Sequence, residues 1–490
     1  MSGKLYGGIT LPNQPDLENI RRLDLMILPQ LNRMSRLGIA VDVPYLQELG
    51  SQFAAEMKEL QYSIASYIPT DALDRFSAAA ASVEEEEGAA SINAGSAEQI
   101  RTLLFDLLDV GRDQKLKTTG TGAISTGKKN LDTLRSVKDA HPVIPLIMQY
   151  RERSKLKSAF CDALPLKARH HPAGACCPVC ELPHVAATNR LHTTFTTTRA
   201  ITGRLSSKQP NLQQIPIRTD IGGRIRAAFV ASPGTRLVSV DFSQMEIRDL
   251  AHLANAASMI RIYEADGDIH TNTAMKAFGI ADASKVDKYK HRLPSKRTNF
   301  GIQNGTTKKG LFAQLVGDYW AAGIVPPDWL TEDWCDTFIA DWHHVYPEVQ
   351  PYFETRYYLA RRYGFVWEPF GRVRYIPQVR SSLPWKVHEG LREAQNFAVT
   401  ASNAEQTKLA MAECEEIFES LLASGVWCWP LLSIHDQVIA EADERYADLV
   451  GAEMVRIFEG VMDDRDTGER LWRCPIKSDC EILTRWKAKD

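Results

Sequence analysis

The stretch RLVSVDFSQMEIRDLAHLA, residues 236–254, contains a short apolar run that ends on a carboxylate. Residues 237–240 predict a buried strand, and Asp241 follows directly. The segment behind it has the spacing of an amphipathic helix, and Ser243 and Glu246 at its start predict a capping box. An acid at the tip of a buried strand is unfavourable unless a positive charge compensates for it. The sequence therefore predicts a cation site at this strand end, shared with a second acid.

Asp436 occupies the same kind of position. The stretch WCWPLLSIHDQVIAEAD, residues 427–443, predicts two short strands that meet at His435 and Asp436. If these strands and the strand before Asp241 are neighbours in one sheet, the two carboxylates converge, and close carboxylates repel unless they share a proton or bind cations. Mg²⁺, a hard ion that prefers oxygen ligands, suits such a pair. This arrangement is typical of two-metal phosphoryl or nucleotidyl transfer.

A third stretch, HRLPSKRTNFGIQNG at residues 291–305, places two cations and an aromatic ring on one stripe of a helix. Arg292, Lys296 and Phe300 follow each other at intervals of four residues. Such a stripe suits a triphosphate with a stacked base, and the alternative is an exposed basic face. Because proline is unfavourable in a helix interior, Pro294 predicts that this helix begins near Arg292 or kinks there.

Composition limits the class of protein without identifying it. The chain has 490 residues, a formal net charge of −3 and a hydrophobic fraction of 44%. These values are ordinary for a globular α+β protein, so any basic surface must be local. No apolar run is long enough to cross a membrane, and the N-terminus lacks the apolar core of a signal peptide. Nine cysteines, an odd number in a long chain, favour reduced thiols, and a cytoplasmic location is expected.

The ordered motifs resemble those of the family A DNA polymerases, the group of bacterial DNA polymerase I and many phage replicases. The matching segments are TGRLSSKQPNLQQIPIRT (202–219), VDFSQMEIRDLAHLA (240–254), DIHTNTA (268–274), RxxxKxxxFG (292–301) and SIHDQV (433–438). The likeness runs from about residue 20 to the C-terminus. It implies a right-hand fold with a helical thumb, a palm on an antiparallel sheet, and helical fingers.

The resemblance also implies the following division of the chain: an N-terminal extension (1–19); a thumb (20–168) with a low-complexity loop (77–91) and a basic tip (115–130); an insert (169–188); a first palm segment (189–254); fingers (255–385); and a second palm segment (386–490).

Roles for individual residues follow from the same resemblance. It makes Asp241 and Asp436 catalytic ligands of two Mg²⁺ ions, with help from the backbone carbonyl of Phe242. Residues expected to bind the incoming nucleotide are Arg292, Lys296, Phe300, Gln244, His270, Glu246 and Asn304. Residues expected to contact DNA are Arg204, Asn211, Gln213, Arg218, Asn396, His435, Gln437, Lys128 and Lys129. Glu246 would exclude the 2′-hydroxyl of a ribose, in addition to any capping role.

Three positions depart from the family pattern. Asn304 replaces a tyrosine at the template-base position, Gln437 replaces a glutamate of the metal motif, and Thr400 replaces a glutamine that contacts the minor groove. Asn304 cannot stack a ring, and Gln437 lacks the charge of glutamate. Altered fidelity, lesion bypass, or a catalytically weakened protein that binds primer and template is therefore the alternative to an ordinary polymerase.

The expected activity is the DNA-templated addition of deoxynucleotides to a primer 3′ end. A single-subunit RNA polymerase is disfavoured by Glu246 and by the extent of the match to DNA-enzyme motifs. The residues before 20 leave no room for a 3′–5′ exonuclease domain, so this chain is expected not to proofread. A separate exonuclease or processivity factor could act as a partner beside primer–template DNA and deoxynucleoside triphosphates.

The insert at 169–188 carries a pattern of its own. Cys177, Cys180 and His184 have the ligand types and the CxxC turn of a structural zinc site. Cys176, His170 or His171 is expected to supply the fourth ligand. The alternative is a polar loop with unpaired thiols.

Overall fold

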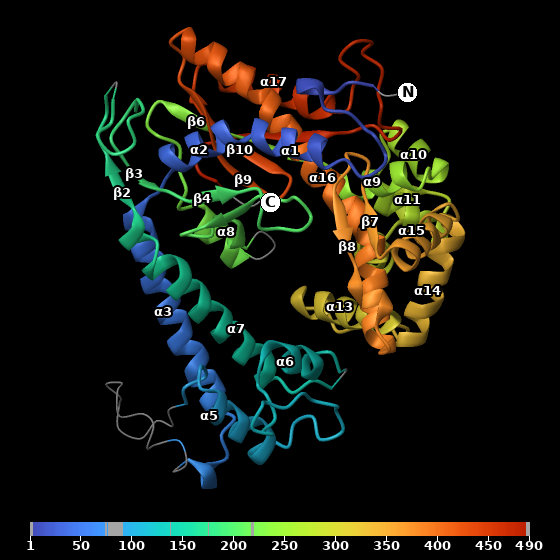
Figure 1. Cartoon of the computed structure of the whole chain (residues 1–490). Coiled ribbons are helices and arrows are strands. Elements are labelled where there is room, and N and C mark those ends of the chain that lie inside the picture. The colour runs from blue at the N-terminus through green and yellow to red at the C-terminus, as the bar shows by residue number, and fades with distance from the viewer. Residues whose placement is uncertain are drawn as a thin grey trace. The chain divides into compact units, whose positions relative to one another are not determined.

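The computed structural model describes residues 3–73, 76, 92–137, 139–174, 176–216 and 220–486 (Figure 1). The chain forms two compact units, one of residues 1–42, 168–308 and 333–490, the other of residues 43–167 and 309–332. The predicted low-complexity loop at 77–91 lies outside the described residues, and so does Arg218.

A four-stranded antiparallel sheet forms the centre of the first unit. Its order is β11-β6-β10-β9, with bounds Ser478–Leu483, Thr235–Phe242, Gln437–Asp443 and Cys428–Ile434. The helix α17 (Ala447–Glu459) packs on β6 and β11, and α16 (Pro384–Ala423) contacts β9 (Figure 1). The predicted strands before Asp241 and on both sides of His435 and Asp436 are confirmed.

Two helices and a small sheet precede the palm strands in this unit. The helices α1 (Leu17–Met26) and α2 (Leu28–Leu37) are followed by β1 (Ile39–Ala40). Helix does not continue beyond Leu37, because Gly38 adopts a left-handed φ of 67° and the chain turns into a strand. The strand β1 pairs with β3 (Thr188–Leu191), which pairs with β2 (Arg169–His171).

Helices also surround the other motifs. The elements are α8 (Asp220–Arg226), α9 (Met245–Leu253), α10 (Ala257–Glu264), α11 (Ile269–Ala277), α12 (Leu293–Ile302), α14 (Glu332–Val345) and α15 (Val349–Tyr363). Pro294 lies in the first turn of α12, directly after one π-helical turn at Lys288–Arg292. The predicted helix start near Arg292 is thus confirmed. Two hairpins, β4–β5 (Thr194–Thr196, Ser206–Lys208) and β7–β8 (Phe365–Trp367, Val373–Tyr375), complete the unit.

The second unit is helical. It contains α3 (Val43–Ala65), α5 (Ala97–Arg101), α6 (Lys128–Arg135), α7 (Val143–Leu156) and most of α13 (Lys308–Ala321). One apolar stripe of α3 is buried and contains Leu46, Leu49, Phe53 and Ile64. The basic tip is only partly a loop, because its last residues, 128–130, form the start of α6. None of the helices in the described ranges is long and apolar enough to cross a membrane.

Candidate active site

The two acids of the predicted cation site lie at adjacent strand ends. In the antiparallel register of β6 and β10, Asp241 is opposite Gln437, so Asp436 is the next residue beyond that pair. The amide of Phe242 donates to the backbone carbonyl of Asp436 at 3.4 Å. Two residues that are far apart in sequence therefore lie next to each other at the same edge of one sheet.

The charges around Asp436 do not outweigh the effect of its burial. Burial raises the pKa of Asp436, and the nearby Glu246 adds to this, while Arg204 and His435 oppose it. Arg226 interacts with Asp241. Burial lowers the pKa of the Arg226 guanidinium to about 10, although the negative charge of Asp241 acts to raise it. Sequence reasoning missed Arg226, which is 2% exposed and lies 4.0 Å from the centre of the Trp486 ring.

Glu246 does not form the predicted capping box. The helix α9 begins at Met245, and its N-cap residue Gln244 has a left-handed φ of 55° and makes no side-chain cap bond. The carboxylate of Glu246 instead accepts from Arg204 Nη2 at 2.6 Å and from Gln303 Nε2 at 2.5 Å. Donors from two other segments thus take the oxygens that a capping box would use. Gln303, fully buried at the end of α12, was not predicted from the sequence.

The predicted phosphate stripe is present on α12 and the turn before it. Lys296 is exposed, while Arg292 and Phe300 are half-buried. Arg292 already has a partner, since its Nη2 lies 3.0 Å from Asp268 Oδ2 and its Nε donates to the same oxygen at 3.1 Å. Asp268 also caps α11 by accepting from Thr271.

His270 and Phe300 stand beside this stripe. Burial lowers the pKa of His270 to about 4, so the ring is neutral at pH 7. Its Nδ1 lies 2.9 Å from the side-chain amide nitrogen of Asn299, which can only donate, so Nε2 carries the ring proton. The centre of the Phe300 ring is 5.3 Å from that of His270. The arrangement offers an N–H donor next to an aromatic surface.

A cleft of about 630 Å³ opens between the start of the palm and the end of α12. Five of the residues that line it are among those singled out from the sequence: Arg204, Glu246, Asn304, Asn396 and Thr400. Asn304 Oδ1 accepts from Asn396 Nδ2 at 2.9 Å, and Asn304 Nδ2 donates to the carbonyl of Phe300. Thr400 is buried, and its hydroxyl has no partner among the described residues.

Other predicted contact residues have side chains engaged within the protein. Asn211 Oδ1 accepts from the Gln213 amide, and Gln213 Nε2 donates to the Ser433 carbonyl of β9 at 3.0 Å. Gln437 Nε2 donates to Ser239 Oγ at 2.9 Å. These hydrogen bonds fix the positions of the three side chains. Gln244 also has a partner, since its side chain accepts from the Tyr263 hydroxyl at 3.2 Å. Three other predicted contact residues are exposed: His435 at the hairpin turn, and Lys128 and Lys129 at the start of α6.

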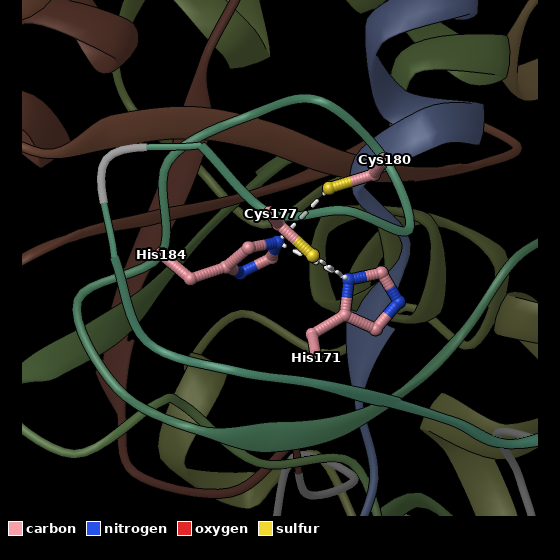
Figure 2. A group of neighbouring side chains, drawn as sticks. All are labelled: His171, Cys177, Cys180 and His184. Carbon is pink, nitrogen blue, oxygen red and sulfur yellow. Dashed lines mark hydrogen bonds between the residues drawn. The ribbon is translucent and has the colours of Figure 1, made fainter.

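The insert brings together four of its candidate ligands. Single donor atoms of His171, Cys177, Cys180 and His184 all lie within 4.8 Å of one another (Figure 2). Cys176 and His170, which were considered for the fourth position, are exposed and lie outside this group. The prediction is therefore corrected in favour of His171.

The chain belongs to DNA polymerase family A, whose sequence profile matches residues 45–488. This confirms the resemblance, and the α+β fold agrees with the expected right-hand architecture. The chain is 35% identical over 434 residues to the thermostable DNA polymerase I of Thermus thermophilus, covering 88% of this chain and 44% of that protein. It is 31% identical over 432 residues to DNA polymerase I of Deinococcus radiodurans, covering 88% and 39%.

A solved structure shares the fold over most of the chain. It is the POL domain of Pol1 from M. smegmatis in complex with DNA primer-template and dNTP, with a TM-score of 0.74 and 26% identity. The match covers 96% of this chain and 73% of that one. The chain spans less than half the length of the curated relatives named above.

Proposed function

We propose that this chain catalyses DNA-templated DNA synthesis, adding deoxynucleotides to a primer 3′ end with two divalent metal ions. The observation that carries the proposal is the position of Asp241 and Asp436 at adjacent ends of β6 and β10. Membership of DNA polymerase family A supports it, as does the similarity to a polymerase domain in complex with DNA primer-template and dNTP.

The donor set fits Mg²⁺. Two carboxylates whose shared site is partly desolvated favour a hard cation, and the raised pKa of Asp436 is the sign of a charge that a cation would compensate. Asp241, Asp436 and the backbone carbonyl of Phe242 would hold the ions. Bound there, the ions would activate the primer hydroxyl and stabilise the charge that develops on the phosphate.

The remaining groups would position the nucleotide. Arg292 and Lys296 present guanidinium and ammonium donors along one stripe for a triphosphate, and His270 offers its Nε2–H beside them. Phe300 would pack against the nucleotide. Primer and template would lie along the cleft lined by Arg204, Asn304 and Asn396, and exposed lysines such as Lys128 and Lys129 would contact backbone phosphates in a salt-sensitive manner.

Primer extension tests the proposal. With Mg²⁺ and four deoxynucleotides, wild type should extend a primer, and Asp241→Asn or Asp436→Asn should reduce the rate at least ~10³-fold, because several kcal/mol of charge stabilisation is removed. Asp443→Asn, a matched change at the far end of β10, should extend like wild type. Equal activity of Asp436→Asn and Asp443→Asn would contradict the metal assignment.

We propose that Glu246 discriminates between deoxyribose and ribose in the incoming nucleotide. It lines the cleft, and its two carboxylate oxygens accept hydrogen bonds from Arg204 and Gln303, which fix the position of the carboxylate. Glu246→Ala should raise incorporation of ribonucleotides relative to deoxynucleotides by about 10-fold or more, since about 1.4 kcal/mol of discrimination suffices. Glu246→Gln, which keeps the bulk, should have a smaller effect. Unchanged sugar selectivity in both variants would remove this role.

One observation favours the alternative of an altered polymerase. Asn304 is joined to Asn396 by a side-chain hydrogen bond, where a ring would stack on the template base. Comparing misincorporation opposite normal and damaged bases in wild type and Asn304→Tyr measures the effect. Tight duplex binding without any extension by wild type would favour a binding module instead.

A further inference from the structure

The insert between β2 and β3 is organised around two histidines and two cysteines. Figure 2 shows the four side chains pointing toward one another. Cys177 Sγ lies 3.3 Å from His171 Nδ1, Cys180 Sγ lies 3.1 Å from His184 Nε2, and the two ring nitrogens are 3.2 Å apart. A tetrahedral zinc ion with sulfur and nitrogen ligands sets separations of about 3.6 Å between S and N and about 3.3 Å between two N atoms. The observed spacings are close to these values.

The loop has no other buried group to hold it. Among the described residues from 171 to 188, the buried ones are His171, Cys177, Cys180 and His184. Among its apolar side chains, Val179 and Val185 are 41% and 48% exposed, and Leu182 is only half-buried. A loop of this length without an apolar core needs another source of order, and small folds of this kind commonly obtain it from a metal.

A chain of hydrogen bonds fixes which nitrogen of His171 faces the cluster. The carbonyl of Ser35 can only accept, so His192 Nδ1, at 3.1 Å from it, carries a proton. The neutral His192 ring then accepts at Nε2 from His171 Nε2–H, at 2.9 Å. The lone pair of His171 is therefore on Nδ1, directed at Cys177 and His184.

We propose that His171 Nδ1, Cys177 Sγ, Cys180 Sγ and His184 Nε2 bind one structural Zn²⁺ ion, and that His192 positions the first of these ligands. Two thiolates neutralise the charge of the ion, so the buried site carries no net charge. Binding releases the thiol protons to solvent. The turn is prepared for a thiolate, because the amide of Val179 points at Cys177 Sγ at 3.4 Å.

The site joins the insert to the palm. Arg36 of α2 donates to the Cys180 carbonyl at 2.7 Å, and Ser35 of the same helix holds His192. His184 leads into β3, where the fully buried Arg190 pairs with Glu441 of β10 at 2.9 Å. The ion would thus stabilise the packing of the insert on α2 and the sheet, away from the acids at the opposite end of β10.

The metal content of the full-length protein is the first measurement. After removal of any affinity tag, wild type purified under reducing conditions should contain about one equivalent of zinc by mass spectrometry. Cys180→Ser and His171→Gln should contain at least tenfold less. Their neighbours provide matched controls: Cys176→Ser and His170→Gln, both exposed, should retain the wild-type content. Less than a tenth of an equivalent in wild type, with no uptake on titration with zinc, would overturn the proposal.

Two further readouts do not depend on how well a ligand variant folds. Co²⁺ titrated into metal-free wild type should give the visible absorption of a tetrahedral site with thiolate charge transfer, and a spectrum without thiolate bands would contradict the ligand set. A chelator selective for zinc over Mg²⁺ should lower the melting temperature of wild type and of Cys176→Ser. An unchanged melting temperature after zinc removal would contradict a structural role.

The role of His192 is tested separately. His192→Phe keeps all four ligands but removes the acceptor for His171 Nε2–H, and zinc affinity should fall about 10- to 100-fold. His192→Gln, whose amide oxygen can accept the same hydrogen bond, should restore most of the affinity. Equal affinities for wild type and His192→Phe would show that His192 does not position the ligand.

Discussion

Glu441 on strand β10 and Asp436 in the turn just before that strand have opposite electrostatic environments. Glu441, five residues after Asp436, is fully buried; burial alone would raise its pKa, but Arg190 and the Ser232 amide outweigh this and lower it. At Asp436, burial and Glu246 outweigh Arg204, and the pKa is raised. The two positions are about 17 Å apart along the strand. The charges of the protein compensate the burial of Glu441, whereas they do not fully compensate the burial of Asp436. A structural acid and a candidate catalytic acid are distinguished by this difference.

The largest expected difference between the two acids is in their contribution to the free energy of unfolding. Glu441→Gln should lower the free energy of unfolding by about 3–5 kcal/mol, because it leaves the buried Arg190 without its counter-charge. Asp436→Asn should leave the free energy of unfolding unchanged or raise it, since it removes an unfavourable charge. Urea denaturation of both variants, without divalent ions, measures this. Equal losses would show that both acids are structural.

A smaller effect concerns the ligand. Mg²⁺ at ten times its dissociation constant should stabilise wild type by about 1.4 kcal/mol, because it binds the folded state. Asp436→Asn should gain much less, and Glu441→Gln should gain as much as wild type. Thermal denaturation with and without Mg²⁺ is the measurement. Equal stabilisation of all three proteins would place the ion elsewhere.

The smallest effect is the sign of the pH dependence. The pKa of Asp436 in the folded state is raised above 3.8, so the folded state binds more protons and the stability of wild type relative to Asp436→Asn should fall as pH rises through that window. For Glu441 the folded pKa is lowered below 4.5, so the stability of wild type relative to Glu441→Gln is present above 4.5 and should be lost as pH falls below it. Slopes of the same sign would contradict the comparison.

The sequence predicts the end of the sheet next to Asp241 and Asp436 well, because the signals there are local. Three local features predict the backbone at their own positions: an apolar run that stops at Asp241, a two-residue bend at Asp436, and Pro294 at the start of a helix. The resemblance to family A then supplied the neighbours. What could not be predicted depends on donors from distant segments. Ser243 and Glu246 have the spacing of a capping box, but Arg204 and Gln303 reach Glu246 only in the folded chain.

The insert shows the same limit. Its ligand types were evident, but three residues competed for the fourth position. The β2–β3 pairing leaves His170 exposed and buries His171, and the turn leaves Cys176 at the surface. The role of the half-buried His192, which lies outside the CxxC pattern, becomes evident only when its ring is placed between His171 and Ser35. Likewise the Arg190–Glu441 pair spans two elements that no sequence period connects.

In the proposed role of Arg292 as a triphosphate ligand, its ion pair with Asp268 would affect nucleotide affinity. Because the guanidinium is already neutralised and oriented, arrival of a triphosphate would be an exchange of one anionic partner for another. Binding would then be driven by the difference between the two pairings, with little ordering of the arginine left to do. Dissociation of pyrophosphate would be assisted in the same way, because Arg292 could pair with Asp268 again as pyrophosphate leaves.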